Sequence, residues 1–258
     1  MSRIRIASAA LLAGASLAVA ATAPAQAAEV VNLHAKFTPN VLGAPTNASG
    51  STTVTSTLGG LPSPMTGFTL KGPAGMRIDT TGTGTCDGAK LEAEGPSVCP
   101  KDSVAGFGGG MGALQLGAQI IEEPFTLNLF LGNNKPGHEV LLLYVEAISP
   151  VSIQLVFTAP VEKMPKPYGL GFHLHIPLIH TLPGASDASV LSAHLTIGAT
   201  NVAYYRKVGG KRKLVHVKGL ILPKKCPKGG FPIESDFSFE DGTTNEVKIT
   251  TPCPRSKK

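Results

Sequence analysis

The chain has 258 residues and a formal net charge of +6, with 42% hydrophobic and only 16% charged residues. The hydrophobic fraction is that of an ordinary globular protein, and it excludes a chain that is disordered throughout. Thirty glycines and 21 prolines, combined with few charges, are typical of an all-β, turn-rich protein rather than a helical one.

The N-terminal segment has the three parts of a secretory signal. Two arginines precede an apolar run over residues 6–21, and Ala25-Gln26-Ala27 is a cleavage site of the A-x-A type. We therefore expect a signal peptide over residues 1–27, removed after Ala27, and a secreted or cell-envelope-associated mature chain without a transmembrane segment. The alternative is an N-terminal membrane anchor, which the shortness of the apolar run disfavours.

Beyond this segment, apolar and polar residues alternate with the period of two that marks half-buried strands. Alternation and short apolar runs predict strands at residues 31–37, 52–58, 66–71, 125–131, 140–145, 151–157, 170–176, 191–197, 202–208, 214–222, 231–240 and 243–251. The run 140–145 is nearly all apolar, which indicates a central strand covered on both faces. Gly209-Gly210-Lys211 and Asp241-Gly242 predict hairpins, and residues 132–137 predict a loop.

A single helical signal interrupts the strands. Asp87 can cap a helix, residues 89–94 are helix formers, and Gly95-Pro96 ends the pattern. The sequence therefore predicts an all-β fold, an antiparallel β-sandwich or jelly roll with one short helix near residues 87–94. We expect one domain over residues 28–258, and the alternative is a small C-terminal β module that begins near Asn201.

The four cysteines form two well-separated pairs in the sequence. Local pairing gives Cys86–Cys99 and Cys226–Cys253, one of three possible connectivities. Export to an oxidising compartment favours disulfides. A four-cysteine zinc site is the alternative, but it needs two tighter pairs than these.

The segments around the cysteines contain distinctive motifs: Cys86-x4-Leu91-x3-Gly95-Pro96-x2-Cys99-Pro100-Lys101-x-Ser103, followed by a Gly-rich strand, Cys226-Pro227-Lys228-Gly229-Gly230-Phe231, Phe237-x-Phe239-x-Asp241-Gly242-Thr243-Thr244 and Thr251-Pro252-Cys253-Pro254. They resemble an uncharacterised family of secreted β-rich proteins of high-GC actinobacteria. That family has no established activity, so the resemblance implies export and architecture only. The basic segment 206–213 is unusual for it.

Known catalytic motifs are absent from the sequence. His138-Glu139 lacks the second histidine of H-E-x-x-H, and neither G-x-S-x-G nor S-x-x-K occurs. Gly108-x-Gly110-x-x-Ala113 matches a dinucleotide fingerprint superficially, but without a βαβ unit its glycines indicate a bulge or close strand packing. Glu122-Glu123 precedes Pro124 and is expected on a turn. We therefore assign no catalytic residue and expect no cofactor, and an enzyme is the less favoured interpretation.

His173 and His175 are the weak candidates for a metal site. Residues i and i+2 of a strand face the same way, so the two imidazoles could share an ion, with His180 or His194 as a further ligand. The alternative, which we favour, is a polar face of a half-buried strand exposed to solvent.

The charge is concentrated near the C-terminus. Residues 28–200 have a net charge of −4, whereas residues 201–258 have +8. Five cations gather in one predicted hairpin: Arg206, Lys207, Lys211, Arg212 and Lys213. Such a patch attracts polyanions, which outside a cell are wall polymers or acidic polysaccharides rather than nucleic acid. The alternative is a solvated hairpin whose lysines prevent edge pairing.

The leading hypothesis is a non-catalytic, secreted or envelope-associated β-protein that binds anionic surface polymers through this hairpin. The alternatives are a secreted hydrolase whose site is assembled only in the fold, and a histidine-based metal-binding module.

Overall fold

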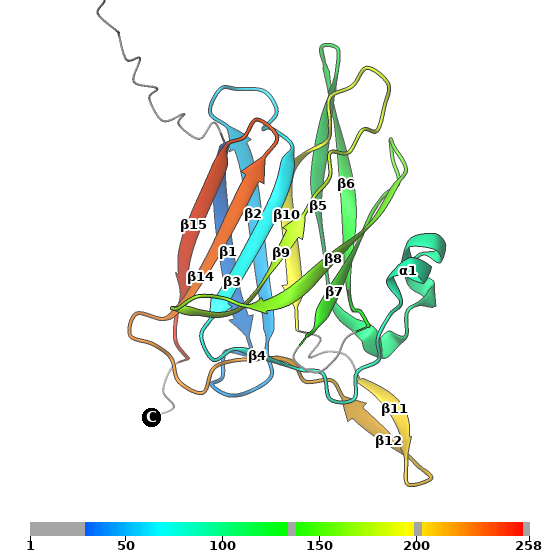
Figure 1. Ribbon diagram of the computed structural model, residues 1–258, viewed down its shortest axis with the longest axis vertical. Coiled ribbons are helices and arrows are strands. Elements are labelled where there is room, and N and C mark those ends of the chain that lie inside the picture. The colour runs from blue at the N-terminus through cyan, green and yellow to red at the C-terminus, as the bar shows by residue number, and fades with distance from the viewer. Residues whose placement is uncertain (1–28, 134–137, 199–202, 255–258) are drawn as a thin grey trace, which may run out of the picture.

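The computed structural model describes residues 29–133, 138–198 and 203–254 (Figure 1). The predicted signal peptide, most of the predicted loop 132–137, and Asn201 lie outside these ranges. The described strands are β1 (Glu29–Thr38), β2 (Asn47–Ser56), β3 (Met65–Pro73), β4 (Arg77–Asp79), β5 (Val104–Leu116), β6 (Gln119–Leu131), β7 (Val140–Ala147), β8 (Ile153–Lys163), β9 (Tyr168–His175), β10 (Ser189–Ile197), β11 (Ala203–Val208), β12 (Lys211–His216), β13 (Gly219–Ile221), β14 (Phe231–Phe239) and β15 (Thr244–Thr251).

Eleven of these strands form one sheet in the order β1-β2-β10-β5-β6-β7-β8-β9-β3-β14-β15. Neighbouring strands in it pair antiparallel, for example Leu129 with Leu143 between β6 and β7. Two small sheets, β11–β12 and β4–β13, stand beside it. The all-β antiparallel fold with one short helix is thus confirmed.

The large sheet curls until its two end strands, β1 and β15, lie side by side (Figure 1). Side chains hold this seam: the Asn245 amide donates to the Glu29 carbonyl at 3.0 Å, and the Thr243 hydroxyl donates to the Glu29 carboxylate at 2.9 Å. The sheet is therefore nearly closed into a barrel, and its inward face encloses the core.

A seven-residue helix, α1 (Gly88–Glu94), covers the outer face of β7. The Asp87 carboxylate accepts from the backbone of Ala89 and Lys90 at 3.0 and 3.1 Å, as the sequence predicted for its N-cap. Leu91 of the helix is fully buried against Leu142 and Tyr144. This packing confirms the prediction that β7 is apolar because both of its faces are covered.

Both predicted disulfides are present in the structure. Cys86–Cys99 closes the segment that carries α1 into a loop, and the Cys86 amide ties this loop to β6 by donating to the Leu131 carbonyl at 2.8 Å. Cys226–Cys253 joins the segment before β14 to the chain just after β15.

Several stretches differ from the strand pattern, among them β4, which alternation did not predict. The Gly-rich β5 shows little alternation, and only the family resemblance implied a strand there. Cβ atoms at Gly106, Gly108 and Gly110 would lie only 2.0 to 2.2 Å from carbonyl oxygens of β10, so these glycines permit close strand packing, as anticipated for part of this motif. The predicted strand 214–222 is broken into β12 and β13 at Gly219, which has φ +58° and touches the Gly198 backbone.

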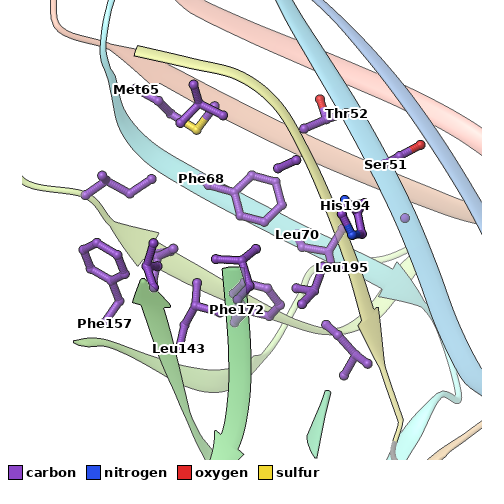
Figure 2. Close-up of a pocket in the computed structure, with 18 of the residues that line it drawn as sticks. Ser51, Thr52, Met65, Phe68, Leu70, Leu143, Phe157, Phe172, His194 and Leu195 are labelled. Carbon is purple, nitrogen blue, oxygen red and sulfur yellow. The ribbon is translucent and has the colours of Figure 1, made fainter. Parts of the chain in front are cut away.

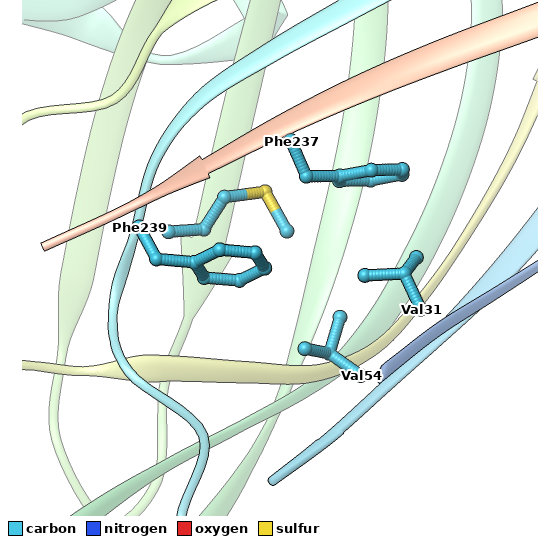
Figure 3. Close-up of a cluster of buried hydrophobic side chains, with 5 residues drawn as sticks. Val31, Val54, Phe237 and Phe239 are labelled. Atoms are coloured by element: carbon cyan, nitrogen blue, oxygen red, sulfur yellow. The ribbon is translucent and has the colours of Figure 1, made fainter. Parts of the chain in front are cut away.

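The core consists of separate clusters, of which the one around Leu91 lies on the outer face under α1 and the others lie on the inward face. One of them joins β1, β2, β3 and β14 through Val31, Val54, Met65, Phe237 and Phe239. Figure 3 shows Val31, Val54, Phe237 and Phe239 pointing toward one another across the barrel.

None of the helices in the described part of the chain has the length and apolar character needed to cross a lipid bilayer.

Candidate functional site

The interior of the barrel contains a cavity of about 330 Å³. Inward-facing side chains of most strands of the large sheet line it, and nearly all of them are apolar. Figure 2 shows the rings of Phe68, Phe157 and Phe172 with Leu143 and Leu195 around a common space. The cavity follows the barrel's length, since Met76 and Leu220 near one end and Ile179 and Ala188 near the other all line it.

The burial pattern of β7 shows where the empty space lies. Leu143 and Val145 point inward and are only half-buried, because they face the cavity. Leu142 and Tyr144 point outward and are 4% and 1% exposed, because α1 covers them. The inward Leu141 and Ala147 of the same strand are 4% and 5% exposed, so the empty space lies beside Leu143 and Val145 rather than along the whole strand.

Small residues on the opposite wall create this space. The inward face of β2 carries the small residues Ala48, Gly50 and Thr52. The inward faces of β7 and β8, in contrast, carry leucine and phenylalanine. The neighbouring position on β10 is Ala193, which pairs with Thr52. Large side chains therefore project from one wall without meeting large side chains from the other.

Few polar residues line the cavity. Thr52 and Thr181 do so, but their hydroxyl oxygens are buried away from it and have no hydrogen-bond partner among the described residues. The Glu123 carboxylate also lines it, is 7% exposed, and accepts from the Val151 amide at 3.1 Å. A buried hydroxyl without a partner is costly in a folded protein, and a polar atom of a ligand would remove that cost.

The acidic pair Glu122-Glu123 does not lie on a turn, which corrects the sequence-based expectation. Both residues belong to β6, and successive residues of a strand face opposite ways. Only Glu123 therefore faces the cavity, so these two carboxylates do not form the pair across a cleft that a glycosidase uses.

The two candidate metal ligands lie on the outer face of β9. His173 and His175 are exposed and face the same way, as the spacing predicted, and His173 Nδ1 lies 2.8 Å from the Thr69 hydroxyl. The further candidates lie elsewhere: His180 is paired with Asp187, and His194 is on β10. The structure does not bring these four histidines together.

A polar network occupies the outer face of β3, β14 and β15. The Lys71 ammonium pairs with Glu234 and, at 2.7 Å, with Asp236, while the Lys248 ammonium lies 3.4 Å from Glu234. The Tyr168 hydroxyl donates to Glu234 at 2.6 Å. Among the described residues, a single group of acidic or histidine side chains lies close enough together to share a metal ion. It consists of Glu234, Asp236 and Glu246. Lys71 and Lys248 already pair with these three carboxylates and offset two of the three negative charges.

The ionisation of this network follows from its contacts. Burial alone would raise the pKa of Glu234, but hydrogen bonds from Lys71 and Tyr168 outweigh it and lower the pKa below its usual value. Burial, assisted by the hydrogen bond to Glu234, raises the pKa of Tyr168 to about 12. Hydrogen bonds to Asp236 and Glu234 raise the pKa of Lys71. The network is therefore a set of matched charges that stabilises the sheet.

The five predicted binding cations belong to the β11–β12 hairpin, which extends away from the barrel beside α1 (Figure 1). Its two strands pair only with each other, through a turn at Gly209 and Gly210 that confirms the predicted hairpin. Lys207, Lys211, Arg212 and Lys213 are exposed. Arg206 lies in β11, and its side chain is outside the described part of the structure. None of the hairpin residues whose side chains the structure describes lines the cavity.

The cavity itself was not anticipated from the sequence. Alternation identifies inward residues but carries no signal of how well they pack. The one available clue was the run of small residues Ala48 to Thr52 and the glycines of β5, which face large side chains across the barrel.

Comparison with protein-family models, with curated proteins and with solved structures finds no match to this chain.

Proposed function

We propose that this chain is an exported, non-catalytic binding protein that holds one apolar molecule, such as a fatty acyl or isoprenoid chain, inside its barrel. The observation that carries the proposal is the 330 Å³ cavity whose inward leucine, valine and phenylalanine side chains are only half-buried. An apolar ligand would take this surface out of water, at about 25 cal/mol per Å² of apolar area buried.

The size of the cavity restricts the ligand. Small-molecule pockets span roughly 300–1,000 Å³, and this one lies at the lower limit. Its volume corresponds to about eleven water molecules at roughly 30 Å³ each. One single-chain molecule fits such a volume better than a lipid with several chains.

The polar atoms of the cavity suggest how the ligand is oriented. Thr52 and Thr181 line otherwise apolar walls, and rotation of either side chain would turn its buried, unpartnered hydroxyl toward the cavity. There, a hydroxyl or carboxyl at one end of an apolar chain would supply the missing hydrogen bond. We therefore propose an amphipathic molecule, with an apolar chain and one small polar group, over a pure hydrocarbon.

Export from the cell agrees with the proposed role of binding an apolar molecule. Two disulfides are typical of proteins that work in oxidising compartments, which supports export. A molecule with an apolar chain dissolves poorly in water, so a protein that surrounds it keeps it in solution.

The test is binding of a series of saturated fatty acids and isoprenoid alcohols to the exported chain, measured by native mass spectrometry and by thermal unfolding. A ligand present at one hundred times its Kd stabilises by about 2.7 kcal/mol, which raises Tm by about 5–10 °C in a chain of this size. A panel that leaves Tm and mass unchanged would contradict the proposal.

A matched pair of variants tests the site itself. Leu155 and Gln154 are neighbours on β8, but Leu155 faces the cavity and Gln154 is exposed on the outside. Leu155→Trp fills the space and is expected to weaken ligand binding at least tenfold, whereas Gln154→Trp is expected to leave it unchanged. Equal binding by both variants would place the ligand outside the barrel.

A further inference from the structure

The β11–β12 hairpin has two different faces. Toward the body of the protein, Tyr204 and Val215 lie over Gly82, where an added Cβ would come within 3.1 Å of the tyrosine oxygen and 3.4 Å of a valine methyl. Successive residues of a strand face opposite ways, so Tyr205 and Leu214 belong to the other face. This second face is directed away from the barrel.

Two large apolar side chains are exposed on this outward face. Tyr205 and Leu214 are cross-strand partners and are 60% and 50% exposed. Lys207 and Arg212 form the next cross-strand pair on the same face. The Arg212 guanidinium lies 4.1 Å from the centre of the Tyr205 ring, so charge and apolar surface adjoin directly.

The charge of the hairpin has one sign. Residues 203–216 contain five Lys or Arg residues and no Asp or Glu. In the described part of the chain, none of the salt bridges involves Lys207, Lys211 or Arg212, so these cations are available to an outside partner.

We infer that the outward face of this hairpin docks on the surface of an anionic lipid bilayer. Cations near such a surface are attracted to its phosphates, and each contributes about fivefold to binding. Tyrosine is favoured at the boundary between lipid headgroups and acyl chains, where its ring is apolar and its hydroxyl remains wet. The adjoining Leu214 adds apolar area that can enter the same layer.

The apolar pair is what favours a bilayer over an anionic polysaccharide. A hydrated polymer would use the cations alone and would leave Leu214 in water. A bilayer uses all four outward side chains, since phosphates meet Lys207 and Arg212 while the acyl boundary meets Tyr205 and Leu214. The inference goes beyond the proposed ligand site, because it concerns a surface that lines no part of the cavity.

The experiment is co-sedimentation of the exported chain with two kinds of vesicle, one of phosphatidylcholine alone and one with about a third phosphatidylglycerol. We expect binding to the anionic vesicles only, and a steep loss of binding as salt is raised. Failure to bind anionic vesicles at low salt would overturn the inference.

Three variants separate the sources of binding. Lys207→Ser with Arg212→Ser removes both cations of the outward face and should weaken vesicle binding at least tenfold. Tyr205→Ser with Leu214→Ser should weaken it severalfold while leaving the charge unchanged. The matched control removes two exposed lysines of the body, Lys90 and Lys163, each to serine, and should bind as the parent does.

Binding to heparin, a soluble polyanion, tests the alternative that the hairpin recognises negative charge alone. If the parent binds heparin as tightly as vesicles, and the Tyr205 and Leu214 double variant retains full vesicle binding, the hairpin is a general polyanion site and the bilayer inference is wrong. Fatty-acid binding measured on the same hairpin variants should be unchanged, so failure here is distinguishable from failure of the proposed ligand site.

Discussion

The two halves of the barrel interior are built from the same sheet, but they are filled differently. In the filled half, Val31, Val54, Met65, Phe237 and Phe239 pack against one another and are each at most 7% exposed. In the hollow half, Leu143, Val145, Leu155 and Phe157 face the cavity and are half-buried. Both halves show the same alternation of apolar and polar residues.

The difference lies in what stands opposite each large side chain. At the border of the filled half, the rings of Phe68 and Phe237 are 5.3 Å apart and pack against each other, and both also line the cavity. In the hollow half, large residues of β7 and β8 face small residues of β2 and β10, such as Gly50 and Ala193. A protein can therefore keep a cavity within one continuous sheet by placing large side chains opposite small ones.

The largest expected effect compares one phenylalanine from each half. Phe237→Ala removes a ring that is 1% exposed in the filled half and should lower the free energy of unfolding by about 3–5 kcal/mol. Phe157→Ala enlarges a space that already exists and should cost clearly less, about 1–2 kcal/mol. Denaturant unfolding of both variants measures the difference, and equal losses would show that the two halves are packed alike.

The next effect concerns the outer wall of the hollow half. Replacing Cys86 and Cys99 together by alanine releases the segment that holds α1 over β7 and should cost about 2–4 kcal/mol. The loss should be local, so hydrogen exchange should accelerate in β6 and β7 before it does in β14 and β15. Uniform acceleration in all four strands would indicate that the two halves unfold as a unit.

The sequence predicted the fold class better than it predicted the site. The strands at residues 31–37, 140–145 and 231–251, the capped helix and both disulfides follow from local patterns, and the structure confirms them. The Gly-rich β5 and the cavity depend on which strands become neighbours. The spacing of Gly108 and Gly110 indicated close strand packing, but not that the neighbour is β10, and nothing in the linear pattern places Thr52 on the wall of a cavity.

A third effect tests whether the filled half depends on the charges of its outer face. The lowered pKa of Glu234 means that folding favours its ionised form, so its contribution to stability is complete above its unfolded pKa of about 4.5 and is lost as pH falls through the lower folded value. Glu234→Gln should therefore make the unfolding free energy less dependent on pH below 4.5 than in the parent.

Raised pKa values give the opposite dependence at alkaline pH. The contribution of Tyr168 is complete below its unfolded pKa of 10.0 and is lost as pH rises toward about 12, and Tyr168→Phe should remove this loss. Urea unfolding at a series of pH values checks both variants. Ligand binding should be unaffected in both, since the network lies outside the barrel; a change in binding would show that the outer face and the cavity are coupled.

The smallest expected effect belongs to the hairpin, which is part of neither half. Lys207 and Arg212 are exposed, and the hairpin's strands pair only with each other. Replacing the two together by serine should change the free energy of unfolding by less than about 0.5 kcal/mol, a shift of about 1–2 °C in Tm. Calorimetry of parent and variant checks this. The same variant should bind vesicles much more weakly, so stability and docking should respond independently. If Tm instead falls by the several degrees expected for an interior change, the cations support the fold through contacts with the barrel. The hairpin would then contribute to the stability of the fold as well as to vesicle binding, and its separation in function from the barrel interior would be wrong.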